Sequence, residues 1–113
     1  MRRGTTPTIN LSVPYASYDI ARAWITFAQR GTIILNKELT DPGVEIEDIT
    51  EQDESVHAVI HVSLTQEDTL AFTANPAELQ VRLLMNDGKA NASGIYNINM
   101  ARIIKDGVIT PEA

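Results

Sequence analysis

Two histidines and a run of acidic residues are the side chains in this chain whose types suit metal or acid–base chemistry. His57 and His61 are four residues apart, a spacing that can hold a metal ion on one face of a helix. The residues around them, HAVIHVSL, alternate apolar and polar side chains, which indicates a strand. On a strand the two imidazoles share a face but lie about 13 Å apart, because each residue rises about 3.3 Å. We therefore interpret them as ordinary polar residues of a sheet.

The acidic residues gather in segment 41–56, which holds seven acids and no base. The whole chain has 15 acids against 9 bases, a net charge of −6, so the remainder has eight acids and nine bases and the acidity is local. Asp48, Glu51, Asp53 and Glu54 could offer oxygen ligands to calcium, but the D-x-D-x-D-G spacing of an EF-hand is absent. We expect a solvated acidic loop that repels phosphates, and so no contact with nucleic acid there.

Motifs for catalysis or cofactor binding are absent from the sequence. No serine stands in a G-x-S-x-G elbow, there is no glycine-rich phosphate loop, and no cysteine is available as a nucleophile or thiolate ligand. The adjacent carboxylates Glu67 and Asp68 stand where the first turn of a helix explains them. We expect no enzymatic activity, no cofactor and no metal.

Trp24, the only tryptophan, is a candidate contact residue. It alternates with Ile25 and Phe27, so if those two face the core, Trp24 lies on the outer face near Tyr15 or Tyr18. An exposed indole often marks a contact surface. Alternatively, the strand is central and both of its faces are covered. The sequence leaves both interpretations open.

The element that positions Trp24 is segment 21–37, which predicts a β-hairpin with its turn at Gln29-Arg30-Gly31. Segments 8–13, 57–64 and 77–85 also alternate as strands do, and the last ends at the turn signal Asn86-Asp87-Gly88. The remaining expectations are a flexible leader over 1–7, a short edge strand over 44–47 within the acidic loop 41–56, a short helix near 65–72 capped by Thr65, a strand over 94–104, and a tail over 105–113 that is irregular or holds a short last strand. Because few segments have helical length, we predict an all-β antiparallel sandwich.

The bulk composition predicts a single domain over 1–113. The chain has 113 residues and 43% hydrophobic content, enough for a core built mainly from Ile, Leu and Val. The lack of cysteine favours folding in a reducing cytosol. No apolar stretch follows Arg2 and Arg3, so we expect no secretory leader. No run approaches the roughly 18–20 apolar residues of a membrane helix, so we expect no membrane contact.

The order of these elements resembles the N-terminal domain of phage baseplate upper proteins and related small tail-associated proteins of prophages. The resemblance rests on the segments TINLSV, WITFAQRGTIILNKE, HVSLTQEDTLAF, AELQVRLLMNDGK and IYNINMARII, and on the opening RRGTTPT. It covers most of the chain, from about residue 2 to residue 104. The acidic stretch 41–56 departs from the pattern because it is longer than the family would lead us to expect.

The resemblance implies an immunoglobulin-like β-sandwich of about 6–8 strands that serves as a non-enzymatic structural protein of a phage or prophage. Such a protein acts through assembly with copies of itself or with other tail proteins, and it passes from the cytoplasm, where it is made, to the tail or baseplate of the virion. The alternative is a module that binds a small ligand or carbohydrate on an aromatic platform. The candidate interaction surface comprises Trp24, Tyr15, Tyr18, Glu45, Glu47, Asp48, Glu51, Asp53 and Glu54. If the acidic loop is an appendage, deleting residues 45–54 leaves folding cooperative.

Overall fold

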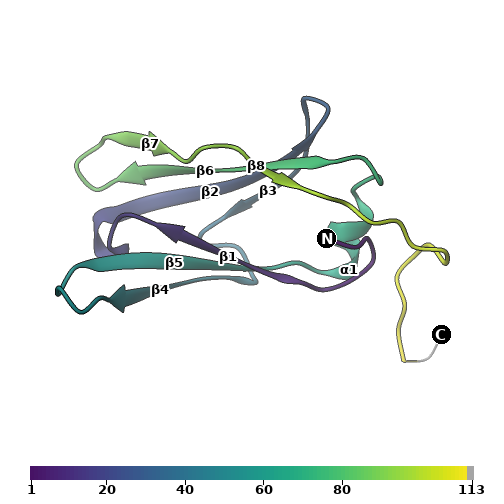
Figure 1. Cartoon of the computed structure of the whole chain (residues 1–113), viewed down its shortest axis with the longest axis horizontal. Coiled ribbons are helices and arrows are strands. Elements are labelled where there is room, and N and C mark those ends of the chain that lie inside the picture. The colour runs from purple at the N-terminus through teal and green to yellow at the C-terminus, as the bar shows by residue number, and fades with distance from the viewer. Residues whose placement is uncertain (112–113) are drawn as a thin grey trace.

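Two antiparallel sheets packed face to face form the body of the protein, as the computed structural model of residues 1–111 shows (Figure 1). One sheet has the order β1-β5-β4, and the other has the order β3-β2-β6-β7 with β8 also pairing β6. The elements are β1 (Thr8–Val13), the 3-10 turn η1 (Ser17–Asp19), β2 (Ile20–Gln29), β3 (Thr32–Glu38), β4 (Val44–Thr50), β5 (Val56–Ser63), α1 (Gln66–Leu70), β6 (Ala77–Met85), β7 (Ala90–Ala92) and β8 (Tyr96–Ile98). The predicted all-β sandwich with one short helix is confirmed.

The β2–β3 hairpin forms where the sequence predicts it. Its two-residue turn places Arg30 and Gly31 at φ values of 52° and 78°, the left-handed conformations that match the twist of the flanking strands. β2 begins at Ile20 and is the central member of its sheet, with β3 on one side and β6 on the other. A bulge between Phe27 and Ala28 in the register adds one residue to the outer strand β3.

The core lies between the inner faces of the two sheets. Ile25 and Phe27 of β2 and Ile60 of β5 are fully buried there, as the alternation along each strand requires. Phe72, just after α1, closes one end of the sandwich. Its ring meets Phe27 edge to face, with centroids 5.7 Å apart and an interplanar angle of 79°, the geometry that aromatic quadrupoles favour.

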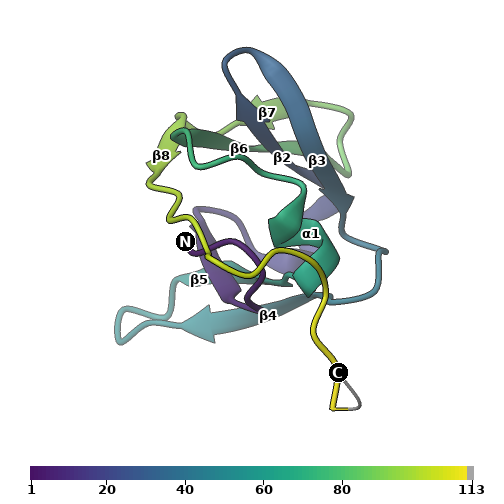
Figure 2. The ribbon, with the colours of Figure 1, turned by 90° about the vertical axis from the view of Figure 1, so that its right-hand side faces the viewer.

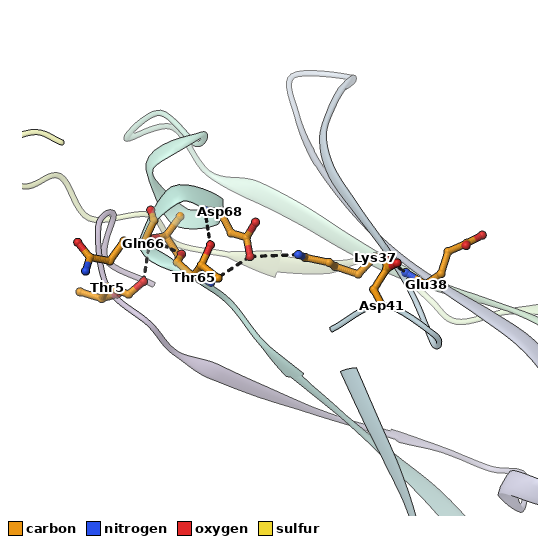
Figure 3. Close-up of polar contacts among 8 residues, drawn as sticks. Thr5, Lys37, Glu38, Asp41, Thr65, Gln66 and Asp68 are labelled. Atoms are coloured by element: carbon orange, nitrogen blue, oxygen red, sulfur yellow. Dashed lines mark hydrogen bonds and ion pairs between the residues drawn. The ribbon is translucent and has the colours of Figure 1, made fainter. Parts of the chain in front are cut away.

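The short helix α1 begins with a reciprocal cap (Figure 3). The Asp68 backbone N–H donates to the Thr65 side chain over 3.1 Å, and the Thr65 backbone N–H donates to the Asp68 carboxylate over 3.0 Å. This arrangement is a capping box in which aspartate replaces the more usual glutamate or glutamine. In Figure 2 the helix lies between the two sheets. Phe72 follows the helix in the chain and is buried.

The prediction of a loop over 41–56 is wrong for the middle of that segment. Residues 44–50 form β4, which pairs with β5 over seven residues, so the expected edge strand is three residues longer than 44–47. Val44 and Ile46 pair with Val62 and Ile60 and face the core. The acidic residues that alternate with them point outward, so pairing does not desolvate their charges. The segment between β3 and β5 is therefore long because it contains an edge strand.

The first seven residues form no strand, but they are held against the opposite end of the chain. Arg2 forms a β-bridge with Ala101, and the Arg3 guanidinium donates to the backbone carbonyls of Phe72 and Leu70. The Thr69 hydroxyl donates to the Thr5 carbonyl over 2.8 Å. These contacts tie the segment expected to be a flexible leader to the end of the sandwich that α1 closes.

The prediction of one strand over 94–104 is wrong over most of its length. The chain pairs with β6 first as β7, at residues 90–92, and again as β8, at residues 96–98. Between them the Ser93 hydroxyl accepts the Val81 N–H over 3.0 Å, which replaces a ladder hydrogen bond with a side-chain one and ends β7. No strand forms over residues 105–111, where the backbone of Ile109 instead exchanges two hydrogen bonds with the Gln66 side chain. Residues 112–113 of the predicted tail lie outside the described residues.

Candidate interaction surface

The outer face of the five-stranded sheet carries several apolar side chains among its polar ones. Side chains that alternate with the core residues point to this face, and the strand register places them in rows. We call it the Trp24 face: Arg22, Trp24, Thr26, Ala28, Ile33, Asn36, Glu38, Glu78, Gln80, Arg82, Leu84, Ala90, Ala92 and the adjoining Ile95. In Figure 2 α1 and the segment after β8 lie on the other side of the sheet. Ile33 and Ile95 remain 67% and 58% exposed.

Trp24 is held in place by its neighbours on this face. The Arg22 guanidinium carbon lies 4.6 Å from the centroid of the indole ring, a cation–π contact. The indole Nε1 donates to Glu38 Oε1 over 2.5 Å, and the same oxygen accepts from Arg22 over 2.7 Å. One side of the ring is therefore occupied by a guanidinium, and its only polar atom is satisfied.

Two charged residues of β6 on the same face are left without an ion-pair partner. Within residues 1–111 neither Glu78 nor Arg82 takes part in a salt bridge. Both are exposed, and they stand two residues on either side of Gln80. Arg82 lies opposite Trp24 in the ladder, and Glu78 lies opposite Ala28.

Two shallow hollows open on the Trp24 face. The larger, of about 420 Å³, is lined by residues that include Trp24, Ile33, Arg82 and Leu84. The smaller, of about 130 Å³, lies beside Ile95 over β2 and β6. Both are open depressions between rows of side chains. Such hollows can receive the side chains of an opposing protein surface, because side chains of packed sheets interdigitate in this way.

The outer face of the three-stranded sheet carries polar side chains that bond across β1, β5 and β4, and the apolar Ile49, which is 39% exposed. His61 Nδ1 lies 2.6 Å from Asn10 Oδ1, and His61 Nε2 lies 2.8 Å from Glu47 Oε1. His57 Nδ1 lies 3.4 Å from Glu51 Oε1. The two histidines thus share a face, as the spacing predicts, and each contacts its own carboxylate. In the part of the chain described, no group of three or more His, Cys, Asp or Glu is placed to hold a metal ion.

The predicted acidic residues are distributed over two sides of β4 and the turn that follows it. Glu45 and Glu47 point outward, whereas Asp48 points to the other side and accepts hydrogen bonds from the Ser17 hydroxyl and backbone N–H. Those bonds, the hydroxyl's above all, lower the pKa of Asp48 below its ordinary value. The remaining three, Glu51, Asp53 and Glu54, lie in the β4–β5 turn.

The β4–β5 turn is itself hydrogen-bonded. Asp53 accepts from the Ser55 hydroxyl over 2.6 Å and from the Ser55 N–H over 3.0 Å, and the side-chain bond is the larger cause of the lowered pKa of Asp53. The Glu51 N–H donates to the Ser55 carbonyl over 2.8 Å. Several of the acids therefore have roles in folding β4 and its turn.

The three aromatic candidates occupy different places. Trp24 lines the larger hollow of the Trp24 face, Tyr15 lines hollows beside β6 and β7 at the edge of the sandwich, and Tyr18 projects from η1 and is 68% exposed. The charged and apolar neighbours of Trp24 are absent from the predicted set. The alternation of β2 and β6 assigns Arg22 and Arg82 to one side each, but only the register between the two strands places them around Trp24.

Comparisons with protein-family models and with curated proteins find no match to this chain. No helix described within residues 1–111 combines the length and the apolar character needed to cross a membrane. The observations define a two-sheet β-sandwich. Both outer faces carry hydrogen-bonded polar side chains, and the Trp24 face also carries Trp24, Leu84 and the exposed Ile33 and Ile95.

Proposed function

We propose that this chain is a non-enzymatic structural module of a phage or prophage tail or baseplate, and that it acts through protein–protein assembly. The observation that carries the proposal is the composition of the Trp24 face. In an antiparallel sandwich the outer side of each sheet is ordinarily polar. Here Trp24, Ile33, Leu84 and Ile95 lie on it together, and gathered apolar side chains on a small domain are typical of a contact surface.

The resemblance to baseplate upper proteins supports the phage assignment. The segments that carry it are largely the strands that build the sandwich: β1, the β2–β3 hairpin, β5 with α1, and β6. An immunoglobulin-like module of this size supplies rigid outer faces and open sheet edges for assembly. On this proposal the partners are further copies of the chain or other tail proteins, and the final location is the virion.

The geometry favours assembly over the alternative of a carbohydrate-binding platform. A sugar stacks on an open aromatic ring, and Arg22 already occupies one side of the Trp24 ring. Tyr15 and Tyr18, the other members of the predicted platform, lie away from the larger hollow that Trp24 lines. The hollows are also open depressions, whereas ligand sites are usually pockets that bury most of their ligand.

The proposal is tested by quantitative mass spectrometry of phage particles. Particles from an induced strain that carries the gene are purified on two successive density gradients. We expect the chain to follow the particle peak in a fixed ratio to the major tail proteins. An abundant cytosolic host protein, measured in the same fractions, controls for carry-over.

The same experiment contains the opposing outcome. A chain that is abundant in the lysate but falls with the host protein through both gradients is not a component of the virion. In that case, binding of the purified chain to a glycan array, lost in W24A and retained in Y18A, would establish the carbohydrate-binding alternative.

A further inference from the structure

We propose that the Trp24 face binds the same face of a second copy of this chain, so that two sandwiches form a two-fold symmetric, four-sheet dimer. The inference rests on the proposed function and names one assembly contact within it. In a two-fold symmetric interface the same surface of both copies is in contact. A contact between one residue of the first copy and a different residue of the second therefore occurs twice, once in each direction. The patch must therefore be complementary to itself in charge and in shape.

The charges of β6 meet this requirement. Glu78, Gln80 and Arg82 form one outward row, with the acid and the base equally spaced on either side of the amide. When a two-fold axis lies between the two faces, across the strands at Gln80, each strand lies over its own antiparallel copy. Arg82 then faces Glu78 of the second copy, and Glu78 faces Arg82 of the second copy. Each charge that lacks an ion-pair partner within residues 1–111 gains one in the dimer.

The side-chain sizes in the neighbouring row are also complementary. The register pairs Trp24 with Arg82, Thr26 with Gln80, and Ala28 with Glu78. The same axis therefore lays Trp24 over Ala28 of the second copy and Thr26 over its own equivalent. A large side chain opposite a small one allows two sheets to interdigitate at about 10 Å separation.

The expected crossing angle of packed sheets does not break these contacts. Aligned sheets cross at about 30°, and Arg82 lies two residues, or about 7 Å, from the axis at about 3.3 Å per residue. The crossing displaces it sideways by roughly 3 Å relative to Glu78 of the second copy. The long, flexible arginine side chain readily spans that displacement.

The size of the face predicts a weak dimer. The strands β3, β2, β6 and β7 have 7, 10, 9 and 3 residues, and at about 3.3 Å per residue and about 4.8 Å between strands they cover roughly 450–500 Å² per copy. The two copies together would bury on the order of 1,000 Å², near the lower limit for specific complexes. The dimer should therefore form at high protein concentration, or where a larger assembly holds many copies together and raises their effective concentration.

The edges formed by β3 and β4 are less suited to binding a second copy. The edge strand β3 carries the bulge opposite Phe27 and Ala28, and bulges obstruct edge-to-edge pairing. The edge strand β4 carries Glu45, Glu47 and Asp48, whose charges repel those of a second β4. The face, in contrast, is neither bulged at its centre nor uniformly charged.

Sedimentation velocity on charge-swap variants tests the dimer. Wild-type protein is measured from about 10 µM to about 1 mM, a range that brackets weak association. We expect its sedimentation coefficient to rise with concentration. Each of R82E and E78R should weaken association at least tenfold, because each places like charges together at two symmetric contacts. The double variant E78R/R82E should restore it, because the swap recreates both opposite-charge pairs.

K89E is the matched control, since it makes the same charge change as R82E in the β6–β7 turn, outside the Trp24 face, and it should dimerise as the wild type does. Circular dichroism and thermal unfolding of every variant should match the wild type. The proposal is overturned by a wild type that stays monomeric throughout, by a dimer insensitive to R82E and E78R, or by a double variant that does not recover. If the chain is monomeric but is found in particles, the dimer is refuted and the structural role stands. If the chain forms a charge-dependent dimer but is absent from particles, the structural role is refuted and the dimer stands.

Discussion

The Lys37 ammonium lies 3.2 Å from Asp68 Oδ2, and the two side chains are only 17% and 14% exposed. The same aspartate closes the capping box of α1, so one carboxylate joins the helix start to the edge strand β3 (Figure 3). Asp41 reinforces the end of β3 by accepting the Glu38 N–H over 2.7 Å. These contacts fix α1, and with it Phe72, at the end of the core.

Acid should destabilise the fold partly through Asp68. Partial burial raises the pKa of Asp68, but hydrogen bonds from Thr65 and Lys37 and the charge of Lys37 outweigh it, so the pKa lies below its ordinary value. The unfolded chain then binds the proton more readily than the folded one. The stability that Asp68 supplies is therefore present above about pH 4, the ordinary aspartate value, and is lost as the pH falls below it through the folded pKa.

Urea unfolding between about pH 2.5 and pH 7 measures this effect in the pH window below the ordinary aspartate pKa. We expect D68N to be less stable than the wild type at neutral pH and to lose less stability than the wild type on acidification. D106N is the control, because Asp106 is 69% exposed and contacts Arg3 at 3.5 Å. A D68N protein whose acid dependence equals that of the wild type would assign the effect to other carboxylates.

Removing the Phe72 ring should cost more stability than any other single change near α1. Phe72 is 1% exposed and packs edge to face on Phe27. F72A leaves a cavity in the core and should lower the free energy of unfolding by about 3–5 kcal/mol. F72L keeps most of the volume and should cost less. Y18A, at an exposed aromatic, should stay within about 0.5 kcal/mol of the wild type. Chemical denaturation measures the free energy of unfolding of all three variants. If F72A is nearly as stable as the wild type, the neighbouring side chains fill the space of the ring without strain.

Gly43 is required at the start of β4 for two reasons that a matched pair of variants separates. Its φ is +83°, and an added Cβ would stand 2.9 Å from the Ser63 carbonyl oxygen. Gly88 has a similar φ of +87° but open space around it. G88A should cost about 1 kcal/mol, the penalty of a left-handed conformation for an L-residue. G43A should cost more, because the backbone must also move. Equal losses of stability for the two variants would show that the contact with Ser63 relaxes freely.

Secondary structure is predicted best where a local pattern of residues, such as alternation, matches the burial of those residues in the fold. Alternation correctly predicts β2, β5 and β6, and the turn at Arg30-Gly31 lies where the sequence predicts it. Thr65 correctly predicts the start of α1. Secondary structure is predicted less well where the chain satisfies its hydrogen bonds through side chains. Ser93 ends β7 by accepting the Val81 N–H, an effect that hydrophobic periodicity does not reveal. The length of β4 is likewise underestimated: the alternation predicts an edge strand only over 44–47, whereas the pairing with β5 continues to Thr50.

The residues that surround Trp24 likewise cannot all be predicted from local patterns in the sequence. Trp24 is the only tryptophan, and the alternation predicts that it lies on the side away from Ile25 and Phe27. Its neighbours Arg82 and Leu84 come from a strand more than fifty residues away in sequence, and only the register between β2 and β6 brings them to it. The charge of the acids in 41–56 predicts a contact surface, whereas Asp48 and Asp53 accept hydrogen bonds from Ser17 and Ser55.

Deleting residues 45–54 should abolish cooperative folding, in contrast to the result expected of a loop appendage. The deletion removes nearly all of β4, so β5 loses its hydrogen-bonding partner along one edge. It also uncovers Ile60 and Val62 by removing Ile46 and displacing Val44, which pack against them in the core. E45Q/E54Q should instead leave the urea midpoint nearly unchanged, because both side chains are exposed and form no ion pair within the described chain. Circular dichroism during urea titration distinguishes the two variants. If the deletion variant unfolds cooperatively at the wild-type midpoint, β4 contributes nothing to the core; if it does not, the acidic residues are the solvent-facing half of a strand that the sandwich needs.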